Sequence, residues 1–286
     1  MSTAFDNSWS ALTSPGQGKH YFNIDYPRFS LDQTYHQNTA LWLAELSRLI
    51  YRNLEQTFLG RAEILRKVSL REVGCFNQPP AYAVVLENQQ EGTPHFFVLV
   101  FRGTYMPQDW LTNLNTFLTS WPEGGRVHRG FKNALERVWD NIEECLSTLQ
   151  GPVFYTGHSL GAALATLVAA RHPPHALYTF GTPRVGDQEF SKLFEKIKAY
   201  RVVNHRDIVS IIPPTILGFC HVGEPHYITH NGHIAVALSE HEIEMDRKKI
   251  DPNLRNCVYH RRWFDPPSCL FNHAPVNYVA HLERLL

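Results

Sequence analysis

The sequence predicts one doubly wound α/β domain, and two observations carry this prediction. Apolar, β-branched runs typical of buried strands alternate along the 286 residues with runs whose apolar positions recur at helical spacing. Between residues 153 and 166, a strand-like run changes within a few residues into an Ala/Leu-rich, helix-like run. In this interpretation residues 1–32 are an irregular lead-in, and residues 33–286 form the single domain.

The expected elements alternate as in such a fold. In chain order they are a helix at 34–54, strands at 81–86 and 95–101, a helix at 130–149, a strand at 153–156, a helix after Ser159, a strand at 176–180, a helix at 187–197, a strand at 200–203 and a final amphipathic segment at 278–286. Residues 213–267 are rich in Pro and His, so we expect long loops there, with short strands near 226–229 and 234–237.

Charge and composition disfavour several classes of protein. Lys plus Arg and Asp plus Glu both number 27, so the formal net charge is zero and nothing electrostatic points to a nucleic-acid partner. No apolar run is long enough to span a bilayer, and the amino terminus lacks the basic and apolar regions of a secretion signal. We expect a cytoplasmic location by default, while leaderless export and a removed leader stay open.

The cysteines give no sign of a crosslinked or metal-bound protein. They are five in number and widely spaced, with no C-x-x-C pair. This pattern indicates neither a disulfide framework nor a zinc site, and it favours a reducing compartment. We expect no cofactor and no metal, and the sequence leaves the oligomeric state open.

Residues 157–161 read Gly-His-Ser-Leu-Gly, the G-x-S-x-G pattern of a nucleophile elbow. In such an elbow a strained strand-to-helix turn exposes a serine hydroxyl, and the two glycines let strand and helix approach closely. The helix that follows directs its amino terminus at the serine, where unpaired N–H groups favour developing negative charge. The alternative is a glycine-punctuated turn with an idle serine. The strand and helix around Ser159 favour a nucleophile.

A nucleophilic serine needs a base to take its proton and an acid to orient that base. With this elbow the partners follow in the order Ser, acid, His. Asp207 lies in a loop just after the strand expected at 200–203, so it is the acid candidate. Asp187 is its rival, although its place after Gly186 is typical of a helix N-cap.

The choice of base is open on composition, because eight histidines follow Asp207. His273 lies in a loop just before the final amphipathic segment, where it could be held against the elbow. We therefore prefer His273 on position. His230 and His233, next to expected strands, remain alternatives.

An oxyanion hole is expected beside the serine. It should combine the N–H of the residue after the nucleophile, Leu160, with an N–H from an earlier strand-to-loop junction. The run Phe-Arg-Gly-Thr at 101–104 supplies that junction and makes Thr104 the second candidate. An apolar stripe follows, which fits either a core-facing segment or a movable lid. Its members are Trp110, Leu111, Leu114, Phe117, Leu118 and Trp121.

Taken together, these motifs resemble the class 3 lipases, the family of the filamentous-fungus triacylglycerol lipases, over residues 41–286. The matching pieces, in the family's order, lie at 101–104, 109–114, 127–131, 156–163, 180–186 and 201–214. The resemblance implies an α/β-hydrolase fold, with a mostly parallel central sheet flanked by helices and a lid over the site. Two departures are the lack of a signal peptide with paired cysteines and Ile208 after the acid, where the family often has Pro.

The resemblance also implies roles for single residues. Ser159 matches the nucleophile and Asp207 the acid. His273 matches the base, because it precedes Tyr278 as the family's histidine precedes a tyrosine near the carboxyl end. The remaining implied positions are Thr104 as an oxyanion residue that uses its hydroxyl as well as its N–H, Asn113 as the lid-side residue that holds this hydroxyl, and a lid across Trp110, Leu111 and Leu114.

The leading functional hypothesis is a triacylglycerol lipase that hydrolyses acylglycerols or other esters at a lipid–water interface. A phospholipase A1 and a short-chain carboxylesterase are the alternatives within the same chemistry. A non-catalytic lipase-like interaction protein is disfavoured by the intact elbow, acid and late histidine. A metal-dependent hydrolase, suggested by the pair His230 and His233, lacks an H-E-x-x-H pattern.

Overall fold

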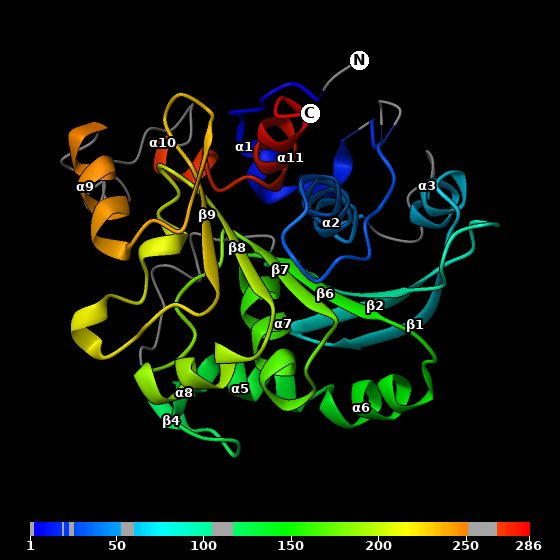
Figure 1. The fold of residues 1–286 in the computed structure, drawn as a ribbon, viewed down its shortest axis with the longest axis horizontal. Coiled ribbons are helices and arrows are strands. Elements are labelled where there is room, and N and C mark those ends of the chain that lie inside the picture. The colour runs from blue at the N-terminus through cyan, green and yellow to red at the C-terminus, as the bar shows by residue number, and fades with distance from the viewer. Residues whose placement is uncertain (1–2, 19, 23–25, 53–59, 105–116, 251–267) are drawn as a thin grey trace.

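An eight-stranded sheet runs through the middle of the structure, a computed structural model that describes residues 3–18, 20–22, 26–52, 60–104, 117–250 and 268–286 (Figure 1). Its strands, in spatial order, are β1 (Leu70–Gln78), β2 (Ala81–Asn88), β3 (Phe97–Phe101), β6 (Val153–His158), β7 (Ala176–Phe180), β8 (Ala199–Asn204), β9 (Glu224–Ile228) and β10 (Ile234–Val236). The strands from β3 to β9 are parallel, and antiparallel strands complete both edges.

The parallel strands determine where a site can form. Every residue of β3, β6, β7 and β8 is buried, which explains why their sequences read as nearly continuous apolar runs. Parallel strands end at the same edge of the sheet, and open α/β sheets form their sites there. The segments that follow β3, β6 and β8 therefore meet at one edge.

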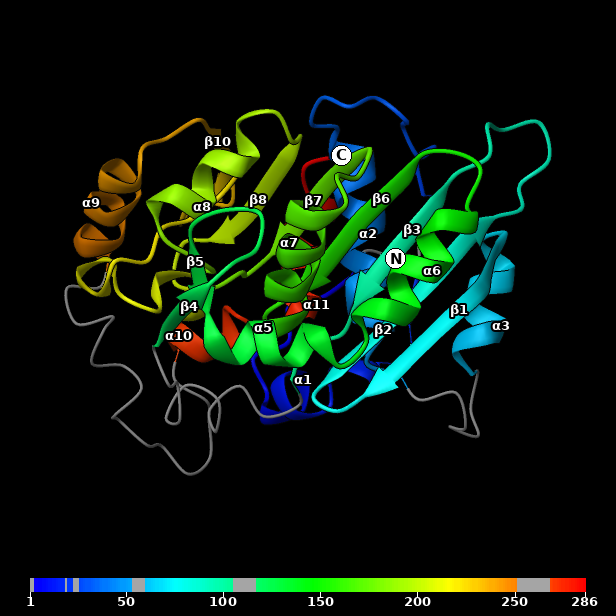
Figure 2. The same cartoon turned by 90° about the horizontal axis from the view of Figure 1, so that it is seen from below.

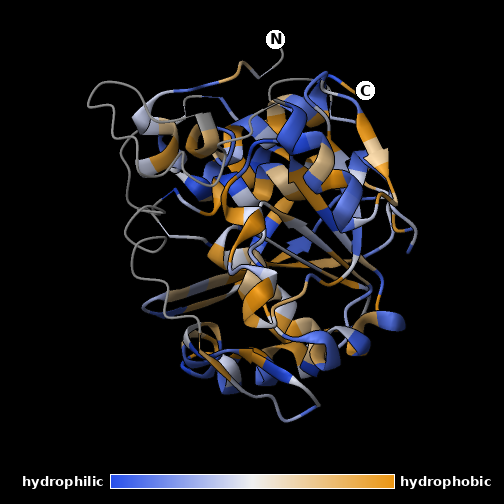
Figure 3. Ribbon diagram, turned by 90° about the vertical axis from the view of Figure 1, so that its left-hand side faces the viewer, coloured by the Kyte–Doolittle hydropathy of each residue, from blue (hydrophilic) through white to orange (hydrophobic). Residues whose placement is uncertain are grey.

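Helices cover both faces of the sheet (Figures 1 and 2). One face carries α2 (Gln37–Leu49), α3 (Arg61–Lys67) and α11 (Pro275–Glu283), and the other carries α5 (Arg129–Glu136), α6 (Trp139–Thr148), α7 (Leu160–Arg171) and α8 (Gln188–Lys192). Alternation along a strand divides its side chains between the two cores, so that Val84 joins one and Val85 the other. Hydrophobic segments accordingly gather in the middle of the molecule in Figure 3.

The remaining elements are short. They are α1 (Trp9–Thr13), α9 (Glu240–Ile250), α10 (Ser268–Phe271), a separate hairpin of β4 (Leu118–Ser120) and β5 (Arg126–His128), and the 3₁₀ turns η1 (Pro15–Gln17), η2 (Leu193–Glu195), η3 (Val209–Ile211) and η4 (Thr215–Leu217). Among the described residues, no helix combines the length and apolarity needed to cross a membrane.

The predicted mostly parallel sheet flanked by helices is confirmed, and most predicted elements lie where the patterns placed them. The helix expected at 130–149 is two helices, because Val138 leaves the helical region at φ −124° and ψ −3°. Val138 and Trp139 are both buried at this break. The edge strand β1 was missed, since it alternates buried and exposed residues over a sequence interrupted by Gly74.

The two ends of the chain differ most from the sequence-based picture. The lead-in, expected to be irregular, contains α1 and η1, and the region expected to be loops contains α9. Cys269 is disulfide-bonded, contrary to the expectation from cysteine spacing, and its bonding partner lies outside the described residues. Cys75, Cys145 and Cys220 are free. The domain boundary at residue 32 stays a prediction.

Candidate active site

Ser159 lies between the end of β6 and the start of α7, in the strained conformation that an elbow requires. Its backbone has φ 59° and ψ −127°, a left-handed region that non-glycine residues rarely adopt. The structure compensates for this strain on both sides. The Ser159 N–H donates to the Phe180 carbonyl at 3.1 Å, and the Ser159 carbonyl accepts from the N–H groups of Ala162 and Ala163 in the first turn of α7.

The elbow closes only because Gly157 and Gly161 lack side chains. A Cβ on Gly157 would lie 2.4 Å from the carbonyl carbon of Gly161, and a Cβ on Gly161 would lie 2.3 Å from the carbonyl oxygen of Phe101. Both contacts are with backbone, so no side-chain rotation could relieve them. The two glycines therefore bring β6, α7 and the end of β3 together around the serine.

The structure brings Asp207 and His273 together beside this elbow. His273 Nδ1 lies 2.8 Å from Asp207 Oδ2, and both side chains are fully buried. Since the carboxylate accepts, Nδ1 carries the proton and the lone pair of Nε2 is available to act as a base. The two residues come from the loop after β8 and from the turn between α10 and α11.

Two further donors satisfy the Asp207 carboxylate. The Val209 N–H donates to Oδ1 at 2.8 Å, and the Tyr278 hydroxyl donates to Oδ2 at 2.6 Å. Burial and the neighbouring carboxylate raise the pKa of Tyr278 well above its usual value, so the phenol keeps its proton and remains a donor. With three donors, Asp207 can orient His273 and stabilise the imidazolium that forms during proton transfer.

His158, which precedes the serine, holds the backbone of the candidate base. Its Nε2 lies 2.6 Å from the His273 carbonyl oxygen, and its Nδ1 lies 3.0 Å from the Tyr51 hydroxyl. A carbonyl can only accept, so Nε2 donates and Nδ1 accepts. Burial and the nearby His273 lower the pKa of His158 well below its usual value, so its imidazole stays neutral in this role.

The second wall of the site is the segment after β3. A Cβ on Gly103 would lie 2.1 Å from the Tyr51 hydroxyl oxygen, 2.6 Å from the His158 carbonyl and 3.2 Å from Ser159 Cβ. Glycine thus lets this segment reach the serine, and Thr104 follows at once. Leu160 opens α7, where a first-turn N–H has no carbonyl within the helix to bond.

Three polar atoms at the site have no hydrogen-bond partner among the described residues: Ser159 Oγ, His273 Nε2 and Thr104 Oγ1. Each is buried, so each is a polar group that a substrate could engage. The serine and histidine do not bond one another in this structure, and such pairs often tighten only when substrate is bound. The predicted lid residues Trp110, Leu111, Asn113 and Leu114 lie outside the described residues.

The rival candidates lie elsewhere or have structural roles. The Asp187 carboxylate caps α8 by accepting from the Phe190 N–H and also binds Arg126, as its N-cap position suggested. His230 and His233 are exposed, away from the buried pair. Within the described ranges, no group of three or more His, Cys, Asp or Glu residues could hold a metal ion.

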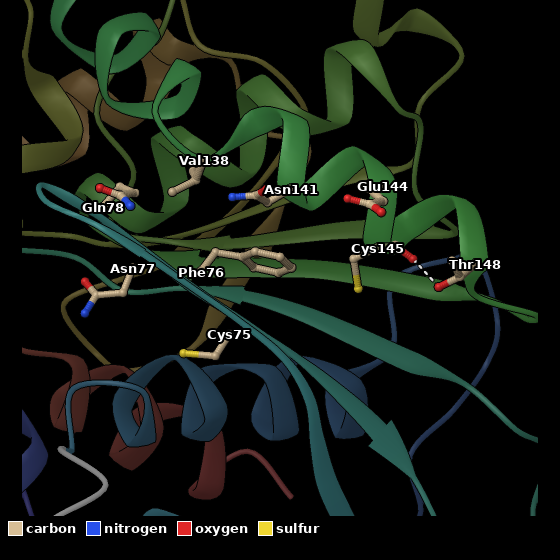
Figure 4. A pocket seen from close by; sticks show the side chains of 9 residues that line it. All are labelled: Cys75, Phe76, Asn77, Gln78, Val138, Asn141, Glu144, Cys145 and Thr148. Carbon is tan, nitrogen blue, oxygen red and sulfur yellow. Dashed lines mark hydrogen bonds between the residues drawn. The ribbon is translucent and has the colours of Figure 1, made fainter.

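Figure 4 shows a pocket between β1 and α6. It has a cavity volume of about 670 Å³, and its walls include Phe76, Val138 and Cys145. None of the residues that line it is among the predicted site residues. We therefore assign it no part in the candidate chemistry.

Sequence reasoning missed Tyr51, His158 and Gly181 as parts of the site. Gly181 has φ +57°, and a Cβ there would lie 2.6 Å from Asp207 Oδ2 and 3.0 Å from His273 Nδ1. For His158 and Gly181 a local signal existed, because each lies in one of the matched motifs. For Tyr51 none existed, because only the fold brings α2 to the elbow.

Comparisons with known proteins agree with this geometry. The family described as "Lipase (class 3)" matches residues 98–217. The chain is 34% identical over 180 residues to a lipase of Rhizomucor miehei (57% of this chain, 49% of that protein) and 36% identical over 152 residues to a chloroplastic phospholipase A(1) of Arabidopsis thaliana (42% and 34%). A solved triacylglycerol lipase, whose catalytic centre is described as a serine protease triad, aligns at 27% identity with a TM-score of 0.55, covering 72% of this chain and 79% of that one.

The matched region spans about half the length of the curated relatives or less. The α/β-hydrolase fold is common to this chain and its structural neighbours. The matched residues contain the glycine-flanked Ser159 and the acid candidate Asp207, in the order that the elbow pattern predicts. The motif order, the fold and the relatives support the assignment of residues 98–217 to the class 3 lipase family.

Proposed function

We propose that the protein is a serine carboxyl-ester hydrolase that acts on acylglycerols as a triacylglycerol lipase. The observation that carries the proposal is the strained Ser159 beside the buried pair of Asp207 and His273. The match of residues 98–217 to the class 3 lipase family supports the same chemistry. No metal or cofactor is needed for it.

In the proposed reaction, Ser159 Oγ attacks the ester carbonyl while His273 Nε2 takes the hydroxyl proton. Asp207 holds the resulting imidazolium in place through Nδ1. The N–H groups of Leu160 and Thr104, with the Thr104 hydroxyl, stabilise the oxyanion. His273 then gives the proton to the leaving alcohol, which leaves an acyl group on Ser159. Water next attacks the acyl carbonyl while His273 takes a proton from it, and His273 returns that proton to Ser159 Oγ as the acid is released.

Exposed apolar side chains support action at a lipid surface. Phe117, which follows the predicted lid residues in the chain, is 62% exposed. Ile216, which follows the loop that carries Asp207, is 89% exposed. Large apolar residues at a loop tip are costly in water and favourable in contact with lipid. A lipid–water interface is therefore the proposed transient partner.

The test of the chemistry is Ser159→Ala in the full chain. Turnover of p-nitrophenyl butyrate should fall about a thousandfold or more, and labelling by an organophosphonate should be lost. Ser147→Ala is the matched control, because Ser147 is exposed and only bonds the Glu144 carbonyl. Substantial hydrolysis by the Ser159→Ala protein would reject the assignment.

A phospholipase A1 is the second candidate, favoured by the similarity to the plant phospholipase A(1). The substrates of the two activities differ in one group on the glycerol, an acyl chain in a triacylglycerol and a phosphate headgroup in a phospholipid. Emulsified triacylglycerols of graded chain length, compared with phosphatidylcholine vesicles at equal interface, separate them. Faster release of fatty acid from phosphatidylcholine would replace the lipase proposal, and smooth saturation by soluble short esters alone would favour an esterase.

A further inference from the structure

Residues 269–273 carry the candidate base, and their only regular secondary structure is the short α10. Each of their backbone carbonyls nevertheless accepts a hydrogen bond. One donor lies within the segment, and the other four come from β6, from the end of β8 and the loop after it, and from α11. In order, Cys269 O accepts from Ile208 N at 3.2 Å, Leu270 O from His273 N at 2.8 Å, Phe271 O from Asn277 Nδ2 at 2.7 Å, Asn272 O from Asn204 Nδ2 at 3.1 Å and His273 O from His158 Nε2 at 2.6 Å.

One of these donors, Asn277, is itself held by the amino-terminal segment. Its Oδ1 accepts from the Asp6 N–H at 2.9 Å, and its Nδ2 donates to the Asp6 carbonyl at 3.1 Å as well as to the Phe271 carbonyl. Both amide protons and one acceptor site are therefore used, in a side chain that is only 2% exposed. A buried amide bonded in this way fixes both of the backbones it joins.

The amino-terminal segment, residues 3–17, is fastened on both sides of this contact. The Thr3 hydroxyl donates to Glu283 at 2.8 Å, and the Gly16 carbonyl accepts from Arg52 at 3.0 Å. Gly16 lies so close to α2 that a Cβ there would be 2.4 Å from the Tyr51 carbonyl carbon. Figure 1 accordingly shows the two ends of the chain side by side, with α1 next to α11.

Between these anchors, α1 packs on the loops of both candidate triad partners. Ala11 and Leu12 share one apolar cluster with residues on either side, which are Ile208 and Val209 after the acid and Cys269, Leu270 and Ala274 around the base. This cluster is separate from the two large cores of the sheet. The cluster therefore joins α1 to the two loops.

We propose that residues 3–17 are an intramolecular brace that sets the position of the candidate base, with Asn277 as the positioning residue. The inference rests on the proposed function, because it assigns the brace a role in proton transfer from Ser159. Without the Asn277 amide, the Phe271 carbonyl keeps only the Ala274 N–H as a donor, at 3.0 Å. The tie between the base segment and residues 3–17 is lost, so the base segment can shift. A shift of a fraction of an ångström at His273 Nε2 slows proton transfer while leaving ester binding unchanged.

The test compares Asn277→Ala with Asn88→Ala in the full chain. Asn88 is a matched control, since its buried amide also donates twice, to Thr93 Oγ1 at 2.9 Å and to the Pro94 carbonyl at 3.3 Å, but it lies on β2. Asn277→Ala should lower kcat for p-nitrophenyl butyrate about tenfold or more with KM within about twofold. Asn88→Ala should lower Tm and leave kcat unchanged.

A second pair of variants works if Asn277→Ala fails to fold. The Asn277 side chain bonds the N–H and the carbonyl of Asp6 and not its side chain, so Asp6→Ala should keep wild-type kcat. Asp6→Pro removes the N–H and should lower kcat. Phosphonylation of Ser159, followed well below the Tm of each variant, should slow by the same factor as kcat.

The outcomes separate the two proposals. Active wild-type protein whose kcat is unchanged by both Asn277→Ala and Asp6→Pro would overturn the brace alone. An equal fall of kcat in Asn88→Ala would also overturn it, because general destabilisation would then explain the loss. Wild-type protein that hydrolyses no ester and does not react at Ser159 would overturn the proposed function and, with it, the brace.

Discussion

At the scale of single residues, Asp207 shows how the fold prepares a buried carboxylate for its candidate role. Its side chain is inaccessible to solvent, so donors must replace the water it has lost. One donor is local, the N–H of Val209, and two arrive from the end of the chain, His273 and Tyr278. The carboxyl-terminal helix therefore takes part in the site as well as in the core.

Tyr278→Phe should lower kcat about tenfold and the free energy of unfolding by about 1–2 kcal/mol, because Asp207 loses one of its donors. The variant keeps the ring, so packing is conserved. Tyr227→Phe is the matched control. Tyr227 is fully buried and its hydroxyl also bonds a carboxylate, that of Asp246 at 2.9 Å, which is not a candidate triad residue. Steady-state kinetics and thermal unfolding of the two variants check the prediction. An equal loss of kcat in both would contradict it.

Gly181→Ala should remove most activity, by about a hundredfold in kcat. The new Cβ would lie within 2.6–3.0 Å of the facing atoms of Asp207 and His273 and would push the pair apart. Gly92→Ala separates this effect from backbone strain, since Gly92 also has a positive φ, +72°, but nothing within 4 Å of the added Cβ. Both variants should lose stability, and only Gly181→Ala should lose turnover.

At the scale of elements, α9 lies outside the sheet and is attached by several polar contacts. Glu240 bonds Arg201, Asp246 bonds the Tyr227 hydroxyl, and Arg247 bonds the loop after β8. Glu240, at the start of α9, bonds the buried guanidinium of Arg201 on β8 and lies 3.7 Å from Arg184. Burial lowers the pKa of Arg201 below its usual value, since the charged form is costly there, and Glu240 partly offsets the effect. Glu240 is therefore one of the contacts that dock α9 on the sheet.

Glu240→Gln should lower the free energy of unfolding by about 2 kcal/mol, because Arg201 keeps its charge and loses its partner. The half-exposed position of Glu240 reduces the effect below that of a fully buried pair. Glu244→Gln, on the same helix, removes an exposed pair with Lys248 and should cost at most about 0.5 kcal/mol. Chemical denaturation of both proteins is the measurement, and equal losses would refute the docking role.

The same helix explains one limit of sequence-based prediction. Its sequence, Glu-His-Glu-Ile-Glu-Met-Asp-Arg-Lys-Lys-Ile, is dominated by charge, and Ile243 is its buried apolar residue in the small cluster with Val203 and Tyr227. A helix with one buried apolar residue, held otherwise by polar contacts, has too little apolar periodicity to detect. By contrast, β3, β6 and β7 were predicted because burial on both faces makes the whole strand apolar.

At the scale of the whole molecule, the site combines local and distant contributions, and only the local ones could be predicted. The elbow and the segment after β3 lie within short motifs, so Ser159, Leu160 and Thr104 followed from the pattern. The choice among late histidines did not, because it depends on which one the fold carries to Asp207. Contacts such as Asp6 with Asn277, 271 residues apart, leave no signal in a single sequence.

Buried histidines make the whole molecule sensitive to acid. Burial lowers the pKa of His205 and of His281 to about 4 in each case, and nearby positive charge contributes. In the unfolded chain both groups titrate near 6.5. Between these values the unfolded state binds more protons than the folded state, so the free energy of unfolding decreases as the pH falls.

The stability of the protein should therefore be constant above about pH 7 and decline between about pH 6.5 and 4, by about 2 kcal/mol for each of the two histidines. Protonation of His281 should also weaken the contact of residues 3–17 with α11, since the His281 ring contacts Phe5 with centroids 4.6 Å apart. Replacing both His205 and His281 with Gln should make the decline shallower, measured as Tm against pH. A remaining slope is expected from His158, His221 and His226, because burial lowers the pKa of each of them as well. His241→Gln, at an exposed position on α9, should leave it unchanged. A double variant that still loses stability as steeply as the wild type would show that other groups cause the acid sensitivity.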